Sequence, residues 1–224
     1  MRSCWYAPSP YFFRDDSAFD APVLGINLGR LGFLTEVGRA EMLPVLDRVV
    51  AGRTTTETRL LLAGAVIRAG ATVNQHLALN DIVVTRGALA RMIEIDVKVD
   101  DELVSHVKAD GLIVATATGS TAYNLSAGGP ILHPSADALA ITPLAPHALT
   151  NRPIVLPAGA RIRLEPIVEP DADPVVTFDG QYGVQLATGD VIEITRAPRV
   201  LTLMRTSERT HFEMLREKLK WGNV

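Results

Sequence analysis

Short runs of β-type sequence, separated by turn residues, fill most of the chain after Thr55, and this pattern restricts the fold more than any other feature. In one run Ile93, Ile95, Val97 and Val99 alternate with charged residues, which predicts a strand with one buried and one solvated face. Clusters of Pro, Gly and Asp punctuate the runs. So many short strands at this spacing predict an antiparallel β-sandwich. The other expected strands span residues 55–68, 111–115, 153–156, 161–165, 175–178, 191–195 and 200–204.

Three segments have helical patterns instead. In the first, Pro44 fits only the first turn and Gly52 stands where a C-terminal glycine cap is expected. In the last, Ser207 is the expected N-cap. Residues 22–27 form a short apolar run that predicts a buried strand, whereas residues 1–20 have no period and are expected to be irregular. The expected helices span residues 40–50, 120–127 and 208–220.

Composition narrows the class of protein. The chain has 224 residues and 47% hydrophobic content, enough for one large domain or two modest ones. The net charge of −3 does not favour a nucleic-acid binder. A single cysteine, Cys4, excludes a disulfide framework and is typical of a cytoplasmic protein. No apolar run reaches about 18 residues and the N-terminus has no apolar core, so neither a membrane span nor a signal peptide is expected.

The first candidate motif is glycine-rich. Gly25, Gly29 and Gly32 follow the expected strand of residues 22–27 and permit tight turns and close approach of a ligand or another strand. The spacing is not that of the G-x-G-x-x-G dinucleotide fingerprint, so a structural turn is the competing interpretation.

The second motif is Asn80-Asp81, directly before an apolar run. A carboxylate accepts hydrogen bonds and an amide both donates and accepts them, so the pair can bind ribose hydroxyls. An Asx turn before a strand is the alternative.

The third motif is the longest, a block from Lys108 to Pro130. A buried-type strand leads into small and hydroxyl residues, which would expose backbone N–H groups at a helix start, as phosphate requires. Tyr123 can stack on a base or ring, and Asp110 can accept from an amide or a hydroxyl. A Gly/Ser/Thr loop that only cushions a tight turn is the alternative.

The fourth motif, Asp179-Gly-Gln181, is a hairpin turn by default. A glutamine beyond the turn can reach a ligand, although nothing local indicates one. His133 and His147 have no metal-type spacing to the cysteine, so both are interpreted as structural and no metal ligand is assigned.

In their order and spacing, these blocks resemble the NAD kinase family from about Ala21 to Gly222. The matching motifs are G-x-N-x-G-x-L-G-F-L, A-L-N-D, K-A-D-G, T-G-S-T-A-Y-N-L-S-A-G-G-P-I-L, P-x-x-P-H-x-L, R-P-I-V and D-G-Q, of which T-G-S-T-A-Y is the most specific. The resemblance implies an α+β fold, mainly an antiparallel β-sandwich. It implies residues 21–40 as a remnant of an N-terminal α/β nucleotide domain, 41–205 as the β-sandwich NAD-binding domain and 206–224 as a C-terminal helix that packs on the N-terminal domain.

The resemblance also implies an activity, the phosphorylation of the 2′-hydroxyl of the adenosine ribose of NAD to give NADP. ATP or polyphosphate would be the phosphate donor, with Mg²⁺ or another divalent metal, in a homodimer or homotetramer without nucleic-acid or membrane partners. The family usually has Glu at the position of Asp81 and Pro at that of Ala117. The implied dinucleotide-binding residues are Asn80, Asp81, Arg91, Lys108, Asp110, Thr121, Ala122, Tyr123, Asn124, Leu125, Ser126, Ala145 and Gln181.

The largest departure from the family pattern is the GGDG motif, whose aspartate deprotonates the ribose hydroxyl in the family. No glycine precedes Gly25, and the matching position holds Tyr6. Phosphoryl transfer depends on positioning and charge neutralisation, so the loss of this loop should be severe. Two interpretations follow: residues 1–20 reflect a start-site or frame error in the gene of an ordinary NAD kinase, or the chain binds NAD(P) without phosphorylating it.

Overall fold

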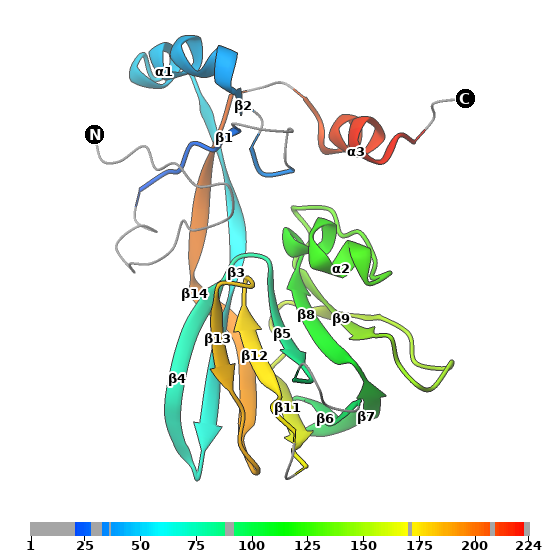
Figure 1. Cartoon of the computed structure of the whole chain (residues 1–224). Coiled ribbons are helices and arrows are strands. Elements are labelled where there is room, and N and C mark those ends of the chain that lie inside the picture. The colour runs from blue at the N-terminus through cyan, green and yellow to red at the C-terminus, as the bar shows by residue number, and fades with distance from the viewer. Residues whose placement is uncertain are drawn as a thin grey trace. The chain divides into compact units, whose positions relative to one another are not determined.

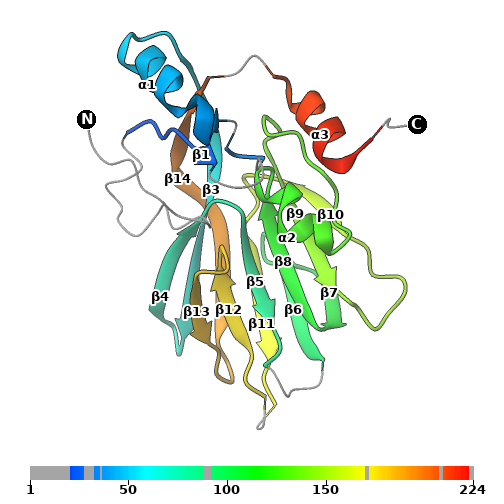
Figure 2. The same cartoon turned by 45° about the horizontal axis from the view of Figure 1, so that its top comes forward.

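The computed structural model describes residues 21–27, 33–35, 37–87, 92–169, 172–206 and 209–221, which form two compact units. One unit holds the described residues up to Arg59 and from Val200 onward, and the other holds Leu60–Arg199 (Figures 1 and 2). Two long strands contribute residues to both units, β3 (Thr55–Arg68) and β14 (Val191–Arg205). The expected 21–40, 41–205 and 206–224 division stays a prediction.

The second unit is built on two six-stranded sheets. The strands of the first sheet are β5 (Asp81–Thr85), β8 (Gly111–Thr116), β9 (Ala138–Leu144), β10 (Ile154–Pro157), β12 (Val175–Phe178) and β13 (Tyr182–Gln185), in the order β10-β9-β8-β5-β12-β13. The second sheet adds β4 (Ala71–Ala78), β6 (Ile93–Val99), β7 (Glu102–Ala109) and β11 (Ile162–Ile167) to β3 and β14, in the order β4-β3-β14-β11-β6-β7.

Apolar side chains of both sheets form one core, which makes this unit the antiparallel β-sandwich that the sequence predicts. In β6, Ile93, Ile95 and Val97 are buried and the charged residues between them are half-buried, so the predicted alternation is confirmed. The expected strands at 191–195 and 200–204 are in fact the single strand β14. Pro198 lies within β14 but outside residues 192–194, which pair with β11.

The central strands β5 and β8 are covered on both faces. One face packs in the core, and on the other a smaller cluster joins Val83, Ile113, Ala115 and Leu144, with Ala127 packed against it. Ala127 follows a short helical segment, labelled α2 in Figure 2, so the segment after β8 folds back over the strand it leaves. This return positions the T-G-S-T-A-Y block on the sheet.

The expected helix of residues 120–127 is too long. The structure has a 3-10 turn, η3 (Gly119–Thr121), and one α-helical turn, α2 (Tyr123–Ser126). Ala122, with φ −99° and ψ −127°, lies outside the helical region and separates them. The N–H of Gly119 already donates to the Thr116 hydroxyl, so a long helix start with free N–H groups, as expected for phosphate, does not form.

The first unit contains β1 (Ile26–Asn27) parallel to β2 (Val37–Gly38), followed by η2 (Arg39–Glu41) and α1 (Met42–Val50). Pro44 lies in the first turn of α1 and Gly52 has φ +67°, as predicted. The expected strand of residues 22–27 is shorter, since Val23 makes only a bridge to Leu203.

The last helix, α3 (His211–Leu219), begins later than expected. Its N-cap is Thr210, whose hydroxyl accepts from the Glu213 N–H at 3.2 Å while the Glu213 carboxylate accepts from the Thr210 N–H at 2.7 Å. The expected N-cap, Ser207, lies outside the described residues. The reciprocal pair is a capping box, which explains why the helix starts here.

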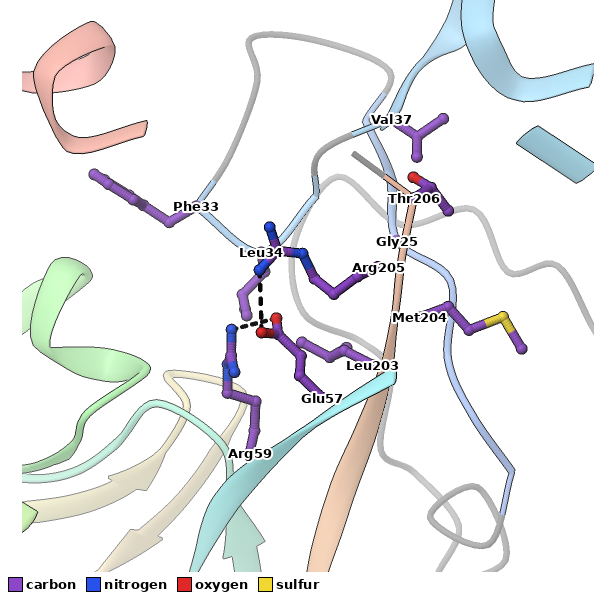
Figure 3. Close-up of a pocket in the computed structure, with 10 residues that line it drawn as sticks. All are labelled: Gly25, Phe33, Leu34, Val37, Glu57, Arg59, Leu203, Met204, Arg205 and Thr206. Carbon is purple, nitrogen blue, oxygen red and sulfur yellow. Dashed lines mark hydrogen bonds and ion pairs between the residues drawn. The ribbon is translucent and has the colours of Figure 1, made fainter. Parts of the chain in front are cut away.

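An ion network joins the two long strands inside the first unit (Figure 3). Glu57 pairs with Arg59 at 2.5 Å and with Arg205 at 3.1 Å, and Arg59 is only 7% exposed. The network lines a cleft of about 10 Å³ beside Gly25 and Phe33. This space is far too small for a nucleotide. Of the three glycines of the first motif, Gly25 lines it, and Gly29 and Gly32 lie outside the described residues.

Candidate functional site

The Asn80–Asp81 turn, defined as residues 79–81, lies where the chain enters β5 (Figure 1). The Asp179 carboxylate, in the connection between β12 and β13, accepts hydrogen bonds from three consecutive N–H groups of this turn. The distances are 2.8 Å from Leu79, 2.7 Å from Asn80 and 3.0 Å from Asp81. The second and fourth sequence motifs, about a hundred residues apart, therefore form one local structure.

The carbonyl groups of the same turn are held from β8. The Thr116 hydroxyl donates to the Leu79 carbonyl at 2.6 Å, and the Thr116 N–H donates to the Asn80 carbonyl at 2.9 Å. Gly119 packs so closely that a Cβ there would lie 2.0 Å from the Asn80 oxygen. A side chain cannot fit at this position, which explains the glycine in the T-G-S-T-A-Y block.

Asp81 is an unusual carboxyl group. It is 5% exposed, and burial followed by repulsion from Asp179 raises its pKa to about 7. Burial also raises the pKa of Asp179, but the three N–H groups oppose that rise. The three N–H groups thus stabilise the charged form of Asp179, whereas no hydrogen bond to the Asp81 carboxyl group is found among the described residues.

A cavity of about 540 Å³ opens at the other end of β5 and β8. Its charged pair is Arg86 and Asp110: the Arg86 Nε donates to the Asp110 Oδ1 at 2.8 Å, and the Asp110 N–H donates to the Leu144 carbonyl at 2.9 Å. Tyr123 also lines it and is 47% exposed. The lining residues are Thr85, Arg86, Gly87, Asp110, Tyr123, Ser126, Ala127, Leu144 and Ala145.

Ala145 adds backbone strain to this cavity. Its φ of +43° is in the left-handed region, which costs a residue with a Cβ about 1 kcal/mol or more. Such strain concentrates at ligand sites, and the position supports the expectation that Ala145 contacts a ligand.

Of the expected site residues, the structure brings Asp110, Tyr123, Ser126 and Ala145 to the cavity. Asn124, in contrast, is fully buried, and its amide is occupied by the Ser120 and Pro130 carbonyls and the Thr142 hydroxyl. This side chain holds the segment together and is not available to a ligand.

The remaining expected residues are dispersed. Lys108 does not line the cavity; it is exposed and pairs with Glu94 at 2.5 Å. Thr121 is half-buried and donates to the Thr118 carbonyl at 3.3 Å, Ala122 is exposed, and Leu125 is half-buried. Arg91 and Tyr6 lie outside the described residues.

Gln181 follows Asp179 and Gly180 in the same connection, and its N–H donates to the Phe178 carbonyl at 2.9 Å. Its buried Nε2 has no hydrogen-bond partner among the residues that the structure describes. Arg86, Thr116 and Asp179 are additional site residues. Thr116 and Asp179 lie in the third and fourth motifs, which assigned them no role, and Arg86 lies in none of the motifs.

A family model and known relatives match the chain in sequence. Residues 79–206 match the family model of the ATP-NAD kinase C-terminal domain. An NAD kinase of Citrifermentans bemidjiense is 47% identical over 203 residues, which cover 91% of this chain and 70% of the relative. An NAD kinase of Aromatoleum aromaticum is 48% identical over 206 residues, which cover 92% of this chain and 68% of the relative.

Solved structures give the same result. The crystal structure of yeast NADH kinase complexed with NADH has a TM-score of 0.83 at 30% identity, over 91% of this chain and 60% of that chain. An NAD kinase from Archaeoglobus fulgidus in complex with ATP has a TM-score of 0.74 at 29% identity, and the match covers 89% of this chain and 74% of that chain. The fold and these matches thus define an ATP-NAD kinase C-terminal domain. The chain belongs to the NAD kinase family, and it spans about 60% of the yeast enzyme.

Proposed function

We propose that this chain binds NAD for phosphorylation of the 2′-hydroxyl of its adenosine ribose, the reaction that gives NADP. Beyond family membership, one observation carries the proposal: a hydrogen-bonding turn and a cavity lie at opposite ends of the same two paired strands, β5 and β8. The T-G-S-T-A-Y block connects them, because Gly119 packs on Asn80 whereas Tyr123 lines the cavity.

The spacing of the two subsites fits a dinucleotide. Asp81 and Thr85 are the ends of β5, and four residues at about 3.3 Å each separate them by roughly 13 Å. A dinucleotide consists of two nucleosides joined by a flexible pyrophosphate, so it can occupy both subsites at once. A mononucleotide would fill only one.

Each subsite suits one part of NAD. In the turn, the Asp81 carboxyl group would accept from ribose hydroxyls and the Asn80 amide would donate to them. In the cavity, Asp110, which the Arg86 guanidinium holds by a hydrogen bond, would accept from an amide N–H of the nicotinamide, and Tyr123 would stack on the ring.

We further propose ATP as the phosphate donor, with polyphosphate as the alternative, since ATP is bound in the Archaeoglobus relative. Among the described residues, no three His, Cys, Asp or Glu side chains form a group that could hold a metal ion. These residues therefore do not fit a protein-held Mg²⁺ site, and no step is assigned to one. None of the described helices is both long and apolar enough to cross a bilayer.

The absent GGDG motif favours a second candidate for these 224 residues, NAD(P) binding without catalysis. The phosphate-cradling glycines are missing, and Tyr6, at the matching position, is a weak base because a phenol has a reference pKa of about 10. We expect little or no NADP from NAD, Mg²⁺ and ATP with this chain alone. A chimera that carries a GGDG-containing family segment ahead of Ala21 should form NADP, as a coupled dehydrogenase assay would measure.

Binding is tested separately from catalysis. NAD or NADP should raise the melting temperature of the 224-residue chain, and Asp110→Ala should remove that rise. Asp137→Ala is the matched control, since Asp137 is an exposed aspartate that pairs with Arg196 away from the cavity. A rise that survives D110A would put the ligand elsewhere, and turnover by the short chain equal to that of the chimera would refute the catalytic argument.

A further inference from the structure

Asp179 is attached to the Asn80–Asp81 turn by its backbone as well as its side chain. Its N–H donates to the Asp81 carbonyl at 2.9 Å, in addition to the three N–H groups that its carboxylate accepts. Oδ1 accepts from Asn80 and Asp81, and Oδ2 accepts from Leu79. The two oxygens therefore fix three successive peptide planes.

The connection between β12 and β13 holds the carboxylate in this place. Asp179 has φ +51° and Gly180 has φ +65°, so both residues are in the left-handed region. Aspartate and asparagine tolerate this conformation better than other residues with a side chain. The turn therefore accommodates Asp179→Asn without backbone change.

From the other side, Thr116 and Gly119 fix the carbonyl groups of the same turn, as described above. The N–H groups of residues 79–81 therefore donate to the connection between β12 and β13, and the Leu79 and Asn80 carbonyl groups accept from Thr116 of β8. With both sets fixed, the directions in which the Asn80 and Asp81 side chains leave the backbone are fixed as well.

We propose that Asp179 is a positioning residue for ribose recognition: by accepting the three N–H groups of residues 79–81, it holds Asn80 and Asp81 in the conformation that binds the hydroxyls. It does not touch the ligand itself. This inference rests on the proposed function, because that function assigns ribose binding to the turn. It also gives the D-G-Q motif a role that a hairpin turn alone does not explain.

Asp179 has a second effect on the turn through its charge. Asp179 is the one charged group whose interaction shifts the pKa of Asp81 among the described residues, and it shifts that pKa upward. Removal of the Asp179 charge should consequently move the titration of Asp81 to lower pH. Asp179→Glu, which retains the charge, should leave that titration unchanged, and this comparison separates the charge effect from a loss of burial, which would lower the same pKa.

The test compares D179N with Asp190→Asn in the full chain. Asp190 is the matched control because it is also buried and also accepts a backbone N–H in a turn, that of Ala187 at 2.8 Å, but belongs to neither subsite. At pH 8, D179N should weaken NADP binding about tenfold in calorimetry, while D190N stays within twofold of the unchanged chain. D179N binding within twofold of the unchanged chain would overturn the proposal.

Two measurements without ligand separate this inference from the proposed function. In D179N, the backbone amides of residues 79–81 should exchange their hydrogens faster, and the Asp81 carboxyl carbon should titrate at lower pH by NMR. If both the exchange rates and the titration are unchanged, the positioning role is overturned, whether or not NADP binds. If D179N does not fold, Asp179→Glu is measured by the same criteria. Asp179→Glu retains the charge but moves the carboxylate oxygens by one methylene. Its affinity for NADP should therefore fall, while the pH at which Asp81 titrates should not.

Discussion

Replacing Asp81 by asparagine should change how stability depends on pH. Asp81 is 5% exposed, and its pKa rises from 3.8 to about 7, mainly through burial and further through Asp179. In the unfolded chain the carboxyl group ionises near 3.8, whereas in the folded chain it stays protonated until about pH 7. The folded state therefore binds the extra proton between these values, and stability falls as pH rises across this window.

The magnitude follows from the size of the shift. About three pH units at about 1.4 kcal/mol each make full ionisation of Asp81 cost about 4 kcal/mol of folding free energy. About 2 kcal/mol of this cost falls between pH 5 and pH 7, and little is added above pH 8. D81N carries no ionisable group at this position, so its stability relative to the unchanged chain should improve by about 2 kcal/mol over that interval.

Urea denaturation of both proteins at pH 5, 6, 7 and 8 measures the difference in their free energies of unfolding. The contributions of other titrating groups are common to both proteins and largely cancel in this difference. D190N serves as a control, since Arg68 lowers the pKa of Asp190 and both states of that group are ionised from pH 5 upward. Its stability difference should be constant over the series. A D81N difference that is also constant within about 0.5 kcal/mol would refute the assignment of the proton to Asp81.

Two further substitutions test local packing. Gly119→Ala should lower the free energy of unfolding by about 1–3 kcal/mol and abolish NADP binding, because the new Cβ meets the Asn80 oxygen; normal binding by a folded G119A protein would contradict the close contact. Thr210→Ala should cost about 1 kcal/mol of stability, since the capping box with Glu213 is lost. The exposed Thr150→Ala provides its control in the same urea titration, and equal effects of the two changes would argue against the cap.

The sequence predicted the parts of the fold that local pattern determines. The alternation in β6 and the cap of α1 at Gly52 are set by neighbouring residues, and both are confirmed. Strand β9 was not predicted, because part of it lies in a proline-rich stretch that reads as a loop. Its Pro143 is accommodated in a strand whose other residues are mostly buried, so packing outweighs the local signal.

The site was predictable to the extent that its residues lie within motifs. Asp110 and Tyr123 belong to the longest block and both line the cavity. Arg86 and Asp179 could not be assigned, because an arginine after a strand and an aspartate in a turn are common features whose partners lie 24 and about 100 residues away. The assignment of Asn124 to a ligand followed from its position in the block, but burial of its amide shows a structural function.

The long separation between Asp179 and the Asn80–Asp81 turn also has a consequence for the order of events during synthesis. The turn emerges from the ribosome about 100 residues before the carboxylate that fixes it. At roughly 5–20 residues per second, this delay lasts on the order of 5–20 s. During that time the nascent chain has both of the side chains proposed to bind ribose but not their fixed geometry, so we expect tight dinucleotide binding only after β12 and the turn that follows it have been made.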